Sequence, residues 1–311
     1  MRMTDKNKLL FIPILAVMGV TYSALFPVNK MSAVSGLPYI GYVFWFSLFA
    51  TVALFIVAAF KHQLPRLGLL HIRAYLVLGL IAVALPVPLL TFISDKLPVG
   101  IITLLLILVP LLTYLMSYFL RVEKFRLTSM IGVLLGLSGM LFVLIPETGL
   151  PSPDMVGWVL LALIGPVCFA ACNAFVVILR PPGTPSLMMA AGMSAAATLM
   201  LAPVMVASGQ AFLFPAASLD GNLAILYAAA ITAATTFAWF TVVRLTGPVF
   251  FSQFNYFIVL GGFGWGYLLE DERHGVYVWI ATALAFVGLA IFTRGAKVEA
   301  RERARVRAPA E

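Results

Sequence analysis

Apolar residues occur along the chain in stretches of about 20, separated by short segments that carry charges, prolines and glycines. A stretch of this length rises about 30 Å as an α-helix, which matches the hydrocarbon core of a bilayer. Strands of a membrane barrel alternate polar and apolar residues over about 10 positions, and these stretches do not alternate. The pattern predicts ten transmembrane helices, over residues 9–29, 37–60, 72–94, 98–119, 127–145, 156–179, 186–208, 222–243, 248–269 and 275–293.

The composition supports a membrane protein. Of 311 residues, 62% are hydrophobic and 10% are charged, and the mean hydropathy is +1.06. Soluble domains carry about a quarter charged residues because their surfaces face water. In lipid, every backbone N–H and C=O must find a partner within the protein, so each apolar stretch is expected to be helical. The expected fold class is an all-α integral membrane protein with ten transmembrane helices.

The distribution of Lys and Arg residues predicts the orientation. With the N-terminus in the cytoplasm, ten spans place every Lys and Arg except Lys30, Lys96 and Arg273 on the cytoplasmic side. This asymmetry is the one that the positive-inside rule describes. Both termini are therefore expected in the cytoplasm, and the protein in the plasma (inner) membrane. The net charge of +8 has the same origin, since basic residues beside a span favour anionic lipids; nucleic-acid binding is not expected.

The chain contains an internal repeat with a spacing of 149 residues. Each half holds five predicted spans, an odd number, so the second half enters the membrane from the opposite side. Inverted repeats are typical of secondary transporters, which bind substrate near the bilayer midplane between the halves. We expect a cytoplasmic N-terminus (1–8), a first five-helix repeat (9–146), an inverted second repeat (154–294) and a basic cytoplasmic tail (295–311). The repeat is carried by Leu111, Tyr118, Leu120, Glu123, Ile131, Leu135 and Gly139, which coincide with Leu260, Tyr267, Leu269, Glu272, Ile280, Leu284 and Gly288.

Motifs in the first half resemble those of a known family. They are Val109-Pro110, Glu123-Lys124, and a stripe of small residues at Gly132, Gly136 and Gly139. With these motifs the chain resembles the drug/metabolite transporter superfamily, specifically its EamA-type members. The resemblance covers residues 9–294 and implies ten helices in two inverted repeats. It also implies transport of metabolites, because known members include exporters of amino acids and other small solutes. The second half departs from the pattern, with Val259 in place of the proline and alanines in place of two glycines.

The predicted span centres contain no ionisable side chain. Asp95, Lys96, Arg244 and Glu270 all lie at span ends, where charged groups reach water. A phosphorylated cargo would need buried Lys or Arg to offset its charge. We therefore expect a small-molecule substrate that is neutral, zwitterionic or amphipathic, moved by alternating access of one repeat against the other.

Candidate substrate-binding residues are the polar and aromatic groups within the helices that line the central cavity of this family. Uncharged amides and hydroxyls can orient a ligand in an otherwise apolar cavity. Each type of residue also has an alternative role. A threonine can bond back to its own helix, and an amide can form a hydrogen bond between helices. Span 222–243 also carries Thr232 and Thr236, and Gly165-Pro166 is expected to open the helix before Asn173. The candidates are Tyr22, Phe26, Asn173, Thr235, Trp239, Gln253, Asn255 and Tyr256.

No catalytic residue, metal site or cofactor is expected. The two cysteines, Cys168 and Cys172, share one face of an apolar helix without further ligands nearby. The alternative functions are an integral membrane enzyme acting on lipids and a structural or receptor-like membrane protein. The first would require interfacial acid–base or metal-binding clusters, and the acidic run Glu270–Glu272 adjoins Arg273 at a span end. The second would require larger loops. Substrate identity, direction, ion coupling and oligomeric state stay open.

Overall fold

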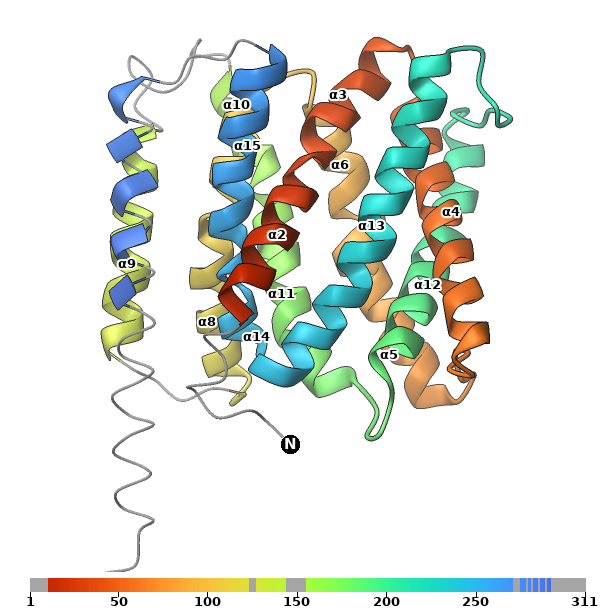
Figure 1. Ribbon diagram of the computed structural model, residues 1–311, viewed down its shortest axis with the longest axis horizontal. Coiled ribbons are helices and arrows are strands. Elements are labelled where there is room, and N and C mark those ends of the chain that lie inside the picture. The colour runs from red at the N-terminus through yellow and green to blue at the C-terminus, as the bar shows by residue number, and fades with distance from the viewer. Residues whose placement is uncertain are drawn as a thin grey trace, which may run out of the picture.

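The computed structural model describes residues 11–122, 127–143, 155–270 and most of 275–291. This part of the chain is all-α and contains no strand. Figure 1 shows the helices standing side by side in one bundle. In chain order they are α2 (Ile12–Ser23), α3 (Leu25–Val34), α4 (Tyr39–Phe60), α5 (Leu69–Gly79), the π-helical turn η2 (Leu80–Ala84), α6 (Pro86–Ile93), α7 (Val99–Leu105), α8 (Leu108–Phe119), α9 (Leu127–Val143), α10 (Met155–Ala162), α11 (Ile164–Leu179), α12 (Ser186–Ala207), α13 (Leu219–Thr246), α14 (Pro248–Phe251) and α15 (Phe254–Glu270).

Seven helical segments within the described residues are long and apolar enough to cross a membrane. The predicted all-α, membrane-spanning fold is thus confirmed. Two further predicted spans correspond to the 17-residue helices α9 and α15, and the last lies partly outside the described residues. The complete set of ten helices therefore stays a prediction. The seven segments are Ile12–Val34, Tyr39–Phe60, Leu69–Ile93, Ile101–Phe119, Met155–Leu179, Ser186–Ala207 and Leu219–Thr246.

Four of these segments are interrupted near their middle, and a proline explains each interruption. A proline supplies no backbone N–H, so the carbonyl four residues earlier loses its helical partner. The first turn of a helix tolerates proline because its N–H groups have no partner within the helix. The third residue of α3, α6, α8 and α11 is accordingly Pro27, Pro88, Pro110 and Pro166.

Small residues bring helices that are distant in sequence into close contact. Gly19 of α2 lies against the backbone of Phe257 in α15, and Gly261 of α15 lies against Val20 and Ser23 of α2. A Cβ atom at either glycine would collide with the backbone of the other helix. Close approach of this kind lets dispersion forces act between membrane helices. The crossing of α2 and α15 is visible in Figure 1.

Helix α12 packs against α4 and α5. Gly192 of α12 accommodates the buried ring of Tyr75 from α5. On the α4 side, Thr51 Oγ1 lies 2.8 Å from Ser194 Oγ and 3.1 Å from Thr198 Oγ1. Interhelical hydroxyl bonds of this type link helices within a bilayer. Apolar side chains such as Phe60 and Leu199 instead expose 82% and 73% of their surface, which suits contact with lipid.

Candidate functional site

A cavity of about 140 Å³ lies within the helix bundle. Its lining comes from α2, α3, α4, η2 and α6 on one side of the sequence and from α11, α12, α13, α14 and α15 on the other. Three of the interrupted segments contribute residues at their breaks, among them Phe26, Ala82 and Leu106. The lining residues are Tyr22, Leu25, Phe26, Asn29, Phe46, Ala82, Val83, Val87, Leu90, Leu106, Phe169, Cys172, Asn173, Met193, Thr232, Thr235, Thr236, Trp239, Phe251, Phe254, Asn255 and Ile258.

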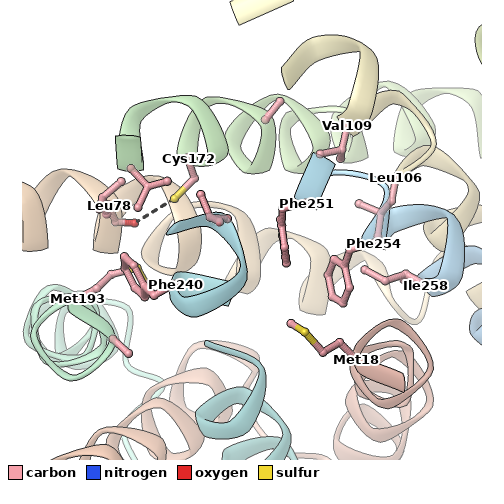
Figure 2. Close-up of a cluster of buried hydrophobic side chains, with 14 of the residues drawn as sticks. Met18, Leu78, Leu106, Val109, Cys172, Met193, Phe240, Phe251, Phe254 and Ile258 are labelled. Carbon is pink, nitrogen blue, oxygen red and sulfur yellow. Dashed lines mark hydrogen bonds between the residues drawn. The ribbon is translucent and has the colours of Figure 1, made fainter. Parts of the chain in front are cut away.

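The lining contains no Asp, Glu, Lys, Arg or His, so it is uncharged. Most of its residues are aliphatic or aromatic. Aromatic rings form much of the wall, and two pairs of them are in direct contact. The Tyr22 and Phe254 rings meet edge to face with centroids 5.6 Å apart, and Phe251 stacks on Phe254 at 5.1 Å. Figure 2 shows Phe251, Phe254 and Ile258 with their apolar neighbours. Such a wall suits an apolar body, and an anion would find no Lys or Arg there.

The structure brings six of the eight predicted site residues to this cavity: Tyr22, Phe26, Asn173, Thr235, Trp239 and Asn255. Gln253 and Tyr256 are buried but do not contribute to its lining. Gln253 donates from Nε2 to the Val249 carbonyl at 3.2 Å, and its Oε1 has no hydrogen-bond partner among the described residues. Tyr256 packs in a separate apolar cluster with Val259 and neighbouring residues.

Asn173 and Trp239 are bonded to each other across two helices. Trp239 Nε1 donates to Asn173 Oδ1 at 2.9 Å, and Asn173 Nδ2 lies 3.5 Å from Thr113 Oγ1 on α8. Both functional groups of the amide are thus engaged within the protein. The pair orders one wall of the cavity, and Asn173 has the interhelical role that sequence reasoning named as its alternative.

The three threonines of α13 differ in their hydrogen bonds. Thr235 Oγ1 donates to the Ile231 carbonyl one turn earlier at 2.6 Å. Thr232 and Thr236 also line the cavity, and their hydroxyls have no hydrogen-bond partner within the described part of the chain. These two hydroxyls are one helical turn apart and share a face of α13. The sequence analysis selected Thr235 among the three. A sequence does not show which of the threonine hydroxyls bonds back to its own helix.

Asn255 lies in the first turn of α15, directly after the break between α14 and α15. Its Nδ2 donates to the Ser252 carbonyl at 2.9 Å, which uses the donor side of the amide. The Oδ1 atom makes no hydrogen bond to any residue that the structure describes, and Asn255 lines the cavity. The bond fixes the orientation of the amide and leaves Oδ1 as an acceptor without a partner in the described structure, beside the second N–H of Nδ2.

Asn29 of α3 is a lining residue that the sequence analysis did not select. Tyr42 of α4 donates its hydroxyl to Asn29 Oδ1 at 3.0 Å. The sequence did contain an indication of its role, because Asn29 is an amide at the end of an apolar stretch, and such a group is costly to bury without a partner. Its bond to Tyr42 fixes the orientation of the amide and joins α3 to α4.

Arg180, just beyond the end of α11, joins the second-half helices below the cavity. Its guanidinium donates from Nη2 to the Thr184 carbonyl at 2.6 Å and from Nη1 to the Phe240 carbonyl at 3.3 Å. Partial burial, with the nearby charge of Arg244, lowers the pKa of Arg180 to about 10. The side chain stays protonated at neutral pH and ties the α11–α12 connection to α13, next to Trp239.

Comparisons with known proteins match the first part of the chain to one family model and most of the chain to a solved structure. The model of the EamA-like transporter family matches residues 10–145. Among solved structures 27 chains match; one, described as the crystal structure of a protein, has a TM-score of 0.62 at 19% identity. That alignment covers 90% of this chain and 97% of the other, and at this identity it shows a shared fold. The search of curated proteins finds no match. The family model thus confirms, for residues 10–145, the resemblance to EamA-type transporters drawn from the sequence motifs.

Proposed function

We propose that the protein is a secondary transporter that moves a small neutral, zwitterionic or amphipathic solute across the inner membrane. The observation that carries this proposal is the uncharged cavity inside a bundle of apolar helices, lined by both halves of the chain. It combines aromatic walls with a few polar groups, the usual composition of a small-molecule site. An apolar cavity of about 150 Å³ holds benzene, so 140 Å³ suits a solute of about one ring in size.

The helix packing supports two inverted repeats. With the 149-residue spacing, α2 corresponds to α11, α4 to α12, α5 to α13 and α8 to α15. The contact between α2 and α15 then has its counterpart in the contact between α11 and α8. Likewise, α4 against α13 corresponds to α12 against α5, and α4 against α12 corresponds to itself. A two-fold relation between halves produces this exchange, and alternating access to a site between them is the mechanism it serves.

Transport is tested with the full-length protein in proteoliposomes, using a panel of amino acids and hydrophobic amines. We expect at least one solute to equilibrate faster than in empty vesicles. Ala82 lines the cavity, so Ala82→Phe should fill it and abolish the added flux. Ala53 of α4 faces outward, so Ala53→Phe adds the same ring at a lipid-facing position and should leave the flux unchanged. Flux equal to that of empty vesicles for every solute would overturn the proposal, as would flux that Ala82→Phe does not alter.

A further inference from the structure

We propose that Thr232, Thr236 and Asn255 form an oxygen subsite that accepts hydrogen bonds from an amine. The substrate is then a small solute with an amino head group, an apolar body and no carboxylate. This inference rests on the proposed transport function and narrows its substrate class.

The first observation is that two hydroxyls in the cavity are unused. Thr232 and Thr236 have no hydrogen-bond partner among the described residues, whereas Thr235 between them is bonded to the Ile231 carbonyl. A threonine in a membrane helix ordinarily bonds back to the preceding turn. Thr241 and Thr246 on the same helix do so, to Phe237 and Val242. Thr232 and Thr236 are the exceptions on α13, and their hydroxyls can form hydrogen bonds with a ligand in the cavity.

The second observation is the orientation of Asn255. Its Nδ2 is held by the Ser252 carbonyl, so rotation of the amide would place two oxygens against each other. The bond therefore leaves Oδ1 as the polar atom without a partner in the described structure, on a residue that is only 4% exposed. Because Asn255 lines the cavity, this acceptor is available to an N–H donor of a ligand.

These oxygens favour an amine over a carboxylate. An ammonium group has N–H donors and no acceptor, which complements hydroxyl and amide oxygens. The rings of Tyr22, Trp239 and Phe254 also line the cavity, and aromatic faces attract a cation. The lining lacks Arg and Lys to pair with a carboxylate, and it also lacks Asp and Glu, so the uncharged oxygens and the aromatic faces are the groups that would hold an ammonium. The single donor of Trp239 is engaged by Asn173, and the uncharged amides of Asn29 and Asn173 cannot by themselves offset a full negative charge.

The test is equilibrium binding to the purified full-length protein by calorimetry, with a series of solutes that share one phenyl ring. Phenethylamine presents N–H donors, its trimethylammonium analogue keeps the charge without N–H donors, and 3-phenylpropionate carries a carboxylate. We expect phenethylamine to bind about tenfold more tightly than the trimethylammonium analogue, and 3-phenylpropionate to bind most weakly. Equal or tighter binding of either analogue would overturn the inference.

Variants locate the subsite. Thr232→Val and Thr236→Val keep the side-chain shape and remove the oxygen, so each should weaken phenethylamine about tenfold and leave the trimethylammonium analogue unchanged. Thr232→Ser, which retains the hydroxyl, should bind phenethylamine as the unmodified protein does. Thr241→Val is the matched control on the same helix, because the Thr241 hydroxyl is bonded to Phe237 away from the lining. Unchanged phenethylamine binding in both Val variants would also overturn the inference.

The outcome separates this inference from the proposed function. If a carboxylate solute is transported and amines are not, the protein is a transporter and the amine subsite is wrong. If no solute on the panel crosses the vesicle faster than without protein, the transport proposal fails and the substrate class fails with it. If phenethylamine is transported and the Val variants lose affinity only for N–H donors, both stand.

Discussion

Trp239 Nε1 donates a 2.9 Å hydrogen bond to Asn173 Oδ1 and so joins α13 to α11 at the cavity wall. Asn173 is 5% exposed, and its Nδ2 lies 3.5 Å from Thr113 Oγ1, which extends the link to α8. A buried amide whose two functional groups are engaged holds the indole ring in a fixed orientation. This wall of the cavity is therefore ordered in the protein alone, which would lower the entropy cost of binding the proposed solute.

Trp239→Phe should lower stability and solute affinity together. The variant keeps an aromatic ring and loses the donor, which leaves Asn173 Oδ1 without that bond. An unpaired buried acceptor costs about 1–3 kcal/mol. We expect the Tm of the purified protein to fall by a few degrees.

Combining Trp239→Phe with Asn173→Leu separates the bond from the loss of side-chain volume. The double variant should be more stable than the sum of the single losses, by about 1 kcal/mol, because neither polar group is then left alone. Purely additive losses would show that the hydrogen bond contributes nothing to the wall.

Gly192→Ala should destabilise the packing of α12 on α5. A Cβ atom at this position would lie against the ring of Tyr75, which is 5% exposed and has little space to move. Overpacking of a buried contact costs about 1–3 kcal/mol. Thermal unfolding measures the loss, and adding Tyr75→Leu should recover part of it.

Gly157→Ala is the matched control for this substitution. Gly157 lies in α10, and no heavy atom stands within 4 Å of the position that its Cβ would take. Alanine forms helices better than glycine, so Tm should stay the same or rise. A loss equal to that of Gly192→Ala would mean that the Tyr75 contact is not the cause.

Arg180→Lys should loosen the connection between α11 and α12. Lysine keeps the charge but cannot reach the Thr184 and Phe240 carbonyls with a planar fork of donors. We expect a loss of about 1–3 kcal/mol in thermal unfolding. Arg244→Gln removes only the neighbouring charge that helps to lower the pKa of Arg180, so its effect should stay within about 0.5 kcal/mol. A loss in Arg180→Lys no larger than that in Arg244→Gln would show that the bonds to the two carbonyls contribute little to stability.

The ten-span topology predicts that both ends of the chain lie in the cytoplasm. A fluorescent protein fused after Glu311 should therefore fold and fluoresce, and alkaline phosphatase fused at the same position should be inactive. In the connection between α12 and α13, for example after Gly209, phosphatase should be active. Active phosphatase at both Gly209 and Glu311 would require an even number of spans between them and would exclude the three spans that the ten-span topology places there.

The membrane-spanning segments and their breaks were predictable because both depend on local properties. The length of an apolar stretch determines whether it crosses the bilayer, and a proline interrupts the helix one turn earlier. Pro166 was recognised from the sequence as a position that opens its helix, and it stands in the first turn of α11. Polar residues such as Asn173 and Asn255 were also found, because an amide in an apolar stretch needs a partner.

The direction in which each side chain points was less predictable. Gln253 and Tyr256 were expected beside Asn255 in the site, but the helix breaks at residues 252–253, and neither lines the cavity. No proline or glycine marks that break, so the rotation of α15 could not be read from the sequence. The bond between Asn29 and Tyr42 joins two helices and likewise depends on tertiary packing.

The contact between α2 and α15 has a consequence for how the cavity would open. Gly19 and Gly261 each lie against the backbone of the opposite helix, so the two helices cannot slide past one another without a collision. One of them comes from the first half of the chain and the other from the second. In the proposed transport cycle they would therefore travel together, and the rigid bodies would be interleaved pairs of helices drawn from both halves of the chain. Each repeat would then flex internally while its helices move with partners from the other one.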